Sequence, residues 1–161
     1  MSLKRKLERS RERKRFEPDA APDAFLRLKE IADKGPVAFC KEALGFEPFD
    51  YQVEFLEPKA PSQFTVLVWC RQSGKSFIVA AYLFWFAVEN DAAQIAVVGP
   101  SFRQSKLVIR KVTSFLLKQP RDILAGKKPL KTKVTFVNGS TIEAYPNNPD
   151  TIRGPTLQLI Y

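Results

Sequence analysis

The chain has 161 residues, of which 45% are hydrophobic and 27% are charged, a composition typical of a single globular domain. It contains no histidine, which excludes histidine-based catalysis and histidine metal ligands. Its two cysteines, Cys40 and Cys70, lie far apart and indicate neither a disulfide framework nor a metal site. The longest apolar run, residues 77–88, is too short to span a bilayer, and the charged N-terminus is unlike a signal peptide. We therefore expect an intracellular protein without a membrane partner.

The net charge of +9 is concentrated in two segments. Residues 1–17 contain eight basic and three acidic residues, and residues 103–133 contain ten basic residues and one acidic residue. Such local basicity is typical of proteins that bind a polyanion such as nucleic acid, although a solvated tail and a solvated helix face would give the same pattern. We predict a flexible basic arm and linker over residues 1–22, followed by a folded domain over residues 23–161.

The first part of this domain, residues 23–60, is expected to be helical. Residues 23–34 have apolar residues at helical spacing, with Asp23 as the candidate N-cap. A second short helix is expected over residues 37–45, and a third is expected to begin near Asp50.

From residue 64 the pattern changes to alternating strands and helices. The sequence FTVLVW (64–69) predicts a buried parallel strand, residues 75–89 predict an enclosed apolar helix, and residues 95–98 predict a second buried strand. Later in the chain, Asn138-Gly139 predicts a hairpin between residues 131–137 and 140–145. Residues 156–161 predict a last buried strand.

Residues 101–118 predict an amphipathic helix with two distinct faces. Helical spacing places five apolar side chains on one face: Val108, Ile109, Val112, Phe115 and Leu116. Arg103, Lys106 and Arg110 fall on the opposite face, where they are candidate DNA contacts.

Between the first predicted strand and the apolar helix lies CRQSGKS, residues 70–76. It ends like a phosphate-binding loop, but Trp69 stands where the general pattern has its first glycine. At a strand-to-helix junction, loop amides and the helix N-terminus bind phosphate, and Gly74 lets phosphate approach the backbone closely. Lys75 would reach the β- and γ-phosphates, and the Ser76 hydroxyl would bind Mg²⁺. Arg71 could neutralise charge that develops during hydrolysis, with an ordinary surface arginine as the alternative.

The motif CRQSGKS resembles the variant Walker A motif of large terminase subunits, the ATPases that package DNA into viral procapsids. That variant lacks the leading glycine. FEPFDYQVEFLE (46–57) resembles the family segment whose aromatic–Gln pair reads adenine. Three further stretches resemble, in order, the strand and helix after Walker A, the segment before Walker B and the Walker B strand: residues 95–112, 134–154 and 156–161. The resemblance covers residues 37–161.

The resemblance implies an α/β fold of the P-loop NTPase type (ASCE or RecA-like). This fold is a three-layer sandwich with a mainly parallel sheet, here preceded by the helical adenine-side segment 23–60, with the Walker A core over residues 64–161. It implies Arg71 and Lys75 as catalytic residues. It further implies an ATP site with Mg²⁺ on Ser76, formed by Tyr51, Gln52, Arg71, Gln72, Ser73, Gly74, Lys75 and Ser76.

In this resemblance the Gln52 amide pairs with the adenine edge, and Phe49 or Tyr51 stacks on the ring. Arg153, in the TIRG loop, joins the basic residues of the amphipathic helix as a candidate DNA or sensor contact, with a role in ordering its own loop as the alternative. The implied partners are double-stranded DNA, the small terminase subunit and the portal protein. The complete protein would form a ring oligomer in the host cytoplasm.

In the family the Walker B strand ends in Asp-Glu, and this sequence ends at Tyr161, about where those acids would follow. We therefore expect an incomplete sheet in which the last strand lies beside residues 64–69 and leaves an apolar edge. We also expect nucleotide binding with poor hydrolysis, because loss of a general base typically costs about 10²–10⁴ in rate. A helicase-type motor ATPase fragment and a non-hydrolysing P-loop nucleotide-binding module or kinase remain as alternatives.

Overall fold

The computed structural model describes residues 22–60, 62–126, 128–148 and 156–161. Nearly all of the predicted basic arm and linker, and Arg153 with its loop, lie outside these residues. The predictions made for them therefore stay predictions.

Three short helices form the first part of the described chain: α2 (Asp23–Ala32), α3 (Pro36–Glu42) and α4 (Asp50–Leu56). They confirm the helical pattern expected for residues 23–60. One detail of the prediction is wrong: Pro22 occupies the N-cap of α2, and Asp23 is the first helical residue. There its carboxylate still lies near the positive end of the helix dipole. Helix α3 begins at Pro36, because a proline ring already has the backbone angle of a first helical residue.

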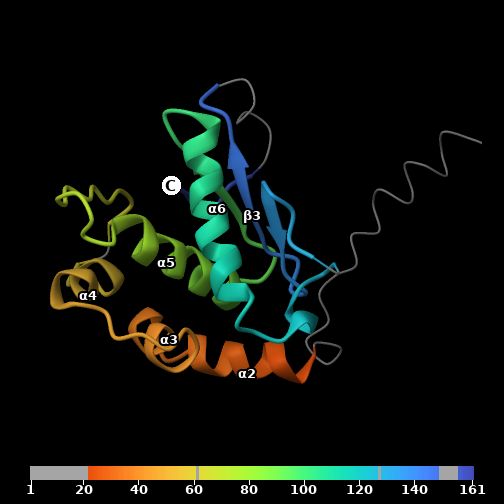
Figure 1. Cartoon of the computed structure of the whole chain (residues 1–161). Helices are drawn as coiled ribbons and strands as arrows, with labels where there is room; N and C mark the ends of the chain where they lie inside the picture. The colour runs from red at the N-terminus through yellow and green to blue at the C-terminus, as the bar shows by residue number, and fades with distance from the viewer. Residues whose placement is uncertain (1–21, 61, 127, 149–155) are drawn as a thin grey trace, which may run out of the picture.

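Helix α5 (Lys75–Glu89) is the central element of the core and has the predicted bounds. Apolar side chains on most of its circumference are buried, including Ile78, Leu83, Phe84 and Val88. Helices α2 and α3 pack against it (Figure 1). The indole nitrogen of Trp85 donates a hydrogen bond of 2.9 Å to the carbonyl oxygen of Ala32, which fixes α2 against α5.

The sheet has four strands: β1 (Gln94–Val98), β2 (Lys133–Thr135), β3 (Thr141–Tyr145) and β4 (Leu159–Ile160). Their order is β2-β3-β1-β4. Strand β1 is parallel to both β3 and β4, whereas β2 and β3 are antiparallel. The described chain is therefore α/β, with a small mixed sheet.

Helix α6 (Phe102–Leu116) lies along β1 and β3 and packs against α5 (Figure 1). The five apolar residues predicted for one face, from Val108 to Leu116, are all buried, which confirms the amphipathic assignment. Ser101 caps the helix, since its hydroxyl accepts a hydrogen bond of 3.4 Å from Gln104 N.

The predicted hairpin around Asn138-Gly139 is confirmed, but its loop is longer than two residues. The antiparallel pairing ends at Thr135 and Thr141. The Asn138 amide is buried in the loop, where its nitrogen donates to the carbonyl oxygen of Ala87 at 2.9 Å and its oxygen accepts from Ser140 N at 3.1 Å. The bond to Ala87 attaches the hairpin to α5, and the bond from Ser140 orders the loop itself.

The prediction of a buried strand over residues 64–69 is wrong. The segment precedes the α5 loop but belongs to none of the four strands. Phe64, Val66 and Val68 are 80%, 83% and 88% exposed, whereas Leu67 and Trp69 pack against the core. A buried strand needs a neighbour that satisfies its backbone groups, and no strand in the described part of the chain pairs with this segment.

The expected position of the last strand is also wrong. Strand β4 pairs with β1 and not with residues 64–69. It is short, and its residue Ile160 is exposed, so the predicted burial does not hold. One edge of the sheet is therefore formed by β4, as expected for an incomplete sheet. The strand beside β4 is β1, whereas the sequence predicted residues 64–69 in that place.

Candidate functional site

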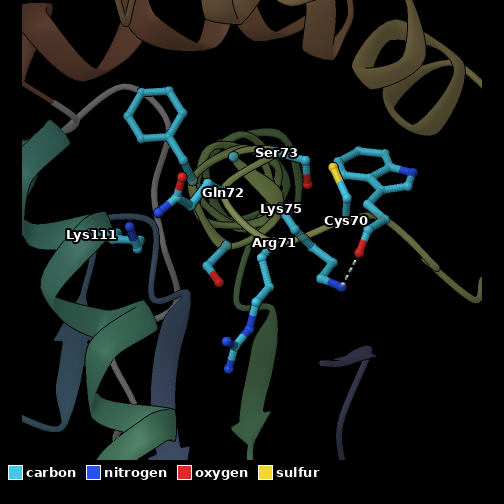
Figure 2. A pocket seen from close by; sticks show the side chains of 10 residues that line it. Cys70, Arg71, Gln72, Ser73, Lys75 and Lys111 are labelled. Carbon is cyan, nitrogen blue, oxygen red and sulfur yellow. Dashed lines mark hydrogen bonds between the residues drawn. The ribbon is translucent and has the colours of Figure 1, made fainter.

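The loop before α5 forms one wall of a cavity of about 420 Å³, lined by residues 69–77 and by Lys111 of α6. This volume lies within the range of small-molecule sites. Figure 2 shows the loop side chains arranged around the start of α5, with Lys111 approaching from the neighbouring helix. The structure thus brings together Arg71, Gln72, Ser73, Gly74, Lys75 and Ser76, as the sequence predicts.

The backbone of this loop alternates between left-handed and ordinary conformations. Gln72 has φ 64° and Gly74 has φ 77°, while Ser73 between them does not have a positive φ. Such alternation turns successive N–H groups toward one concave side, which is an anion-binding arrangement. A left-handed residue other than glycine costs about 1–2 kcal/mol. The strain at Gln72 is typical of functional loops.

The N-terminus of α5 adds further donors. Phe77 N and Ile78 N both donate to the carbonyl oxygen of Gly74, so these two amides are used within the helix. The amides of Lys75 and Ser76 precede them at the end where helix N–H groups have no acceptor inside the helix. The helix dipole places partial positive charge at the same point.

Helix α4 holds this loop in place through two side chains. Tyr51 Oη donates to the carbonyl oxygen of Ser73 at 2.9 Å, and Gln52 Nε2 donates to the same oxygen at 3.3 Å. The C=O and N–H of a trans peptide point in opposite directions. Anchoring the Ser73 carbonyl toward α4 therefore turns the Gly74 N–H away from α4.

Gln52 is more deeply buried than its predicted role in adenine recognition would suggest. It is 4% exposed, and its Oε1 accepts a hydrogen bond of 3.1 Å from Phe49 N. With Nε2 bound to Ser73, one N–H and one lone pair of the amide remain. The sequence did not reveal that Gln52 holds the loop through the Ser73 carbonyl oxygen. The adenine contact of Gln52 stays a prediction.

Two aromatic rings beside the loop are accessible to a ligand. Phe49 and Tyr51 are exposed, and their ring centroids lie 5.8 Å apart with an interplanar angle of 8°. Tyr51 also meets Trp69, which lines the cavity, edge-on at 5.1 Å. An aromatic surface of this kind can stack against a planar base.

The cavity is positively charged. Arg71, Lys75 and Lys111 line it, and its described lining residues include no aspartate or glutamate. Lys75 Nζ donates only a long hydrogen bond, 3.5 Å, to the carbonyl oxygen of Trp69. Among the described residues, none of the three cations forms a salt bridge. The arrangement favours an anionic ligand.

One polar group of the loop lacks a partner. The Ser73 Oγ atom is buried and makes no hydrogen bond to any described residue. A buried hydroxyl without a hydrogen-bond partner costs free energy. A ligand with a hydrogen-bonding atom beside Ser73 Oγ would remove this cost.

The two cysteines differ strongly in environment. Cys70 is exposed in the cavity wall. Cys40 is buried, and burial raises the pKa of its thiol to about 12. Because the thiolate is the reactive form, only Cys70 is expected to react readily with alkylating reagents.

The structure places the other predicted contacts on a separate surface. Arg103 and Arg110 are exposed on α6, and the Lys106 ammonium lies 4.6 Å from the centroid of the Phe102 ring. None of the three basic residues lines the cavity. Lys111, which does line it, was not singled out from the sequence, although it borders the apolar face that packs α6 onto α5.

In the described part of the chain, no helix combines the length and apolar character needed to cross a membrane.

Comparison with known families identifies the chain. The family model described as terminase large subunit, T4likevirus-type, N-terminal, matches residues 66–161. The match covers more than half of the chain and includes the loop, α5, α6 and all four described strands. The chain therefore belongs to the family of N-terminal regions of T4-like large terminase subunits, the ATPase part of viral DNA-packaging motors.

Proposed function

We propose that the cavity formed by residues 69–77 and Lys111 is the nucleotide site of a P-loop ATPase and binds Mg-ATP by its phosphates. The observation that carries this proposal is a loop with left-handed backbone at Gln72 and Gly74, beside three cations and no described carboxylate in the lining. Among anionic ligands, such a site is expected to bind a polyphosphate most tightly.

Individual residues have distinct parts in this proposal. Lys75 would exchange its long contact with the Trp69 carbonyl for the β- and γ-phosphates. Arg71, exposed at the cavity, would neutralise charge on the transferred phosphoryl group. Ser76 lines the cavity from the first turn of α5, so its hydroxyl fits the role of a Mg²⁺ ligand, and the ion would neutralise phosphate charge. The rings of Phe49 and Tyr51 would stack on adenine.

Alkylation of Cys70 in the full chain tests nucleotide binding. Cys70 lies in the cavity wall, so bound Mg-ATP is expected to slow its reaction with a thiol reagent. Buried Cys40 provides an internal measure of unfolding. Lys75→Ala should abolish protection, whereas Lys118→Ala, an exposed charge outside the cavity, should retain it. Unchanged Cys70 reactivity in folded wild-type protein with saturating Mg-ATP would refute the proposal.

The finer assignments follow from the same proposal. The described strands and helices would be part of a P-loop three-layer sandwich. The protein would act on double-stranded DNA with the small terminase subunit and the portal, as a ring oligomer in the host cytoplasm. The poor hydrolysis expected from the sequence stays a prediction, which phosphate release from the same samples tests. DNA should alter nucleotide binding in a motor and leave it unchanged in a non-hydrolysing binding module.

A further inference from the structure

Lys111 differs from the other cations of the cavity because it belongs to a different element. Arg71 and Lys75 come from the loop and the start of α5, whereas Lys111 comes from the middle of α6. Figure 2 shows Lys111 on the opposite side of the loop from Cys70, with Arg71 and Lys75 between them.

Aromatic packing fixes Lys111 at this place. One helical turn after it, Phe115 is buried, and its ring centroid lies 4.9 Å from that of Phe77 and 6.1 Å from that of Phe46. Phe77 is in the first turn of α5 and also lines the cavity. Residues four apart lie on the same side of a helix, so the Phe115–Phe77 contact sets Lys111 beside the start of α5.

The surroundings of Lys111 leave its charge without compensation. Its side chain is half-buried, and among the described residues it has neither an ion pair nor a hydrogen-bond partner. The other charged residues that line the cavity are Arg71 and Lys75, which carry the same charge and repel it. A lysine head group on a flexible stem can move toward an anion that enters the cavity.

We infer that Lys111 is a phosphate-contacting residue of the nucleotide site, which tethers α6 to the polyphosphate chain. This inference rests on the proposed function. The ammonium group of Lys111 donates to a phosphate oxygen from the wall opposite the Cys70 side of the loop. The same helix exposes Arg103 and Arg110, so occupancy of the cavity acts directly on the element that carries the exposed basic face.

Variants at position 111 test the inference in the full chain. Lys111→Met keeps the apolar stem and removes the charge, while Lys111→Arg keeps the charge. Affinity is measured as protection of Cys70 by Mg-ATP and, separately, by inorganic triphosphate. Because the variant cannot form a hydrogen bond to a charged group, Lys111→Met is expected to weaken both ligands about tenfold. Lys111→Arg should restore most of the affinity, and Lys118→Ala should match wild type.

The outcomes separate this inference from the proposed function. If wild-type Cys70 is not protected by either ligand, the nucleotide site itself is refuted. If wild type is protected and Lys111→Met binds both ligands equally well, the role of Lys111 is refuted and the site stands. An equal loss of affinity in Lys111→Met and Lys111→Arg, with unchanged thermal unfolding, would also overturn the inference. Such a result would mean that binding depends on the shape of the side chain and not on its charge.

Discussion

The loop before α5 requires a glycine at position 74 for two independent reasons. The residue has φ 77°, and a Cβ added there would lie 3.0 Å from Gln52 Nε2. The first condition strains any L side chain. The second would displace the amide that holds the Ser73 carbonyl. The same residue therefore controls both the backbone of the loop and its attachment to α4.

Substituting this glycine gives the first prediction. Gly74→Ala is expected to lower the free energy of unfolding by about 1–2 kcal/mol for backbone strain, with a further loss from displacing Gln52. Gly45→Ala is the matched control, because Gly45 has φ 72° but no atom within 4 Å of its added Cβ. Urea unfolding measures both variants. Equal losses at the two positions would show that the contact with Gln52 contributes nothing.

Glu89, the last residue of α5, has a carboxyl group that ionises less readily than that of an ordinary glutamate. Burial raises its pKa, the neighbouring charges of Asp33 and Asp91 raise it further, and Lys29 opposes them. Its Oε2 atom is buried and has no hydrogen-bond partner among the described residues. A carboxylate at a helix C-terminus is also disfavoured by the dipole.

The pH dependence that follows has a definite sign. The pKa of Glu89 is higher in the folded state than in the unfolded state. The contribution of Glu89 to the free energy of unfolding is therefore fully present below the unfolded pKa, and it is lost as the pH rises through the folded pKa. Glu89→Gln should therefore be more stable than wild type at neutral pH, by less than about 1 kcal/mol for a partly exposed group. The difference should vanish in acid. Urea unfolding across pH measures it, with Glu54→Gln as the control for removal of one exposed charge. A constant difference at all pH values would contradict this account.

At the scale of elements, the helices could be predicted and the edge of the sheet could not. The continuous apolar run of α5 and the apolar spacing of the buried face of α6 are both local information, contained within each segment. Residues 64–69 have the composition of a buried strand, yet a strand also depends on a neighbour, which composition cannot provide. The hairpin was predictable because Asn138-Gly139 brings its own partner strands together.

The candidate site shows the same division. The loop from Cys70 to Ser76 could be identified because its residues are consecutive. The hydrogen bond from Gln52 to the loop could not, since its acceptor carbonyl lies twenty-one positions away in the chain. Lys111 was missed for the same reason, because it reaches the loop only through the packing of α6 on α5.

Helix α6 carries the exposed basic face, and its effect on DNA binding is the next prediction. Replacing Arg103 and Arg110 together with alanine should weaken DNA binding similarly for all sequences. It should also reduce the slope of log affinity against log salt by about one for each DNA phosphate that the variant no longer neutralises. Fluorescence anisotropy with labelled duplex DNA measures both effects. Arg27→Ala with Lys59→Ala removes two exposed charges elsewhere and is the control. If both double variants weaken binding equally, net charge and not α6 governs binding.

At the scale of the whole molecule, three of the most exposed large apolar side chains among the described residues lie on the segment that leads into the loop. Phe64, Val66 and Val68 point their side chains outward, while Leu67 and Trp69 pack on the core. Strand β4 ends the sheet on one side and has a single neighbour, β1. An extended apolar segment and an unpaired sheet edge are both features through which protein chains associate.

We therefore expect the protein to self-associate through residues 64–69. Val66→Lys combined with Val68→Lys places two charges on the exposed side of this segment without altering Leu67 or Trp69, which pack on the core. Sedimentation velocity over a concentration series should show less self-association for this variant than for wild type. Leu130→Lys, at a residue that is 64% exposed in a different region, is the control for added charge. If Leu130→Lys reduces association as much, the effect is one of net charge. If neither variant changes it, association occurs through another surface, with the free edge of β4 as the next candidate.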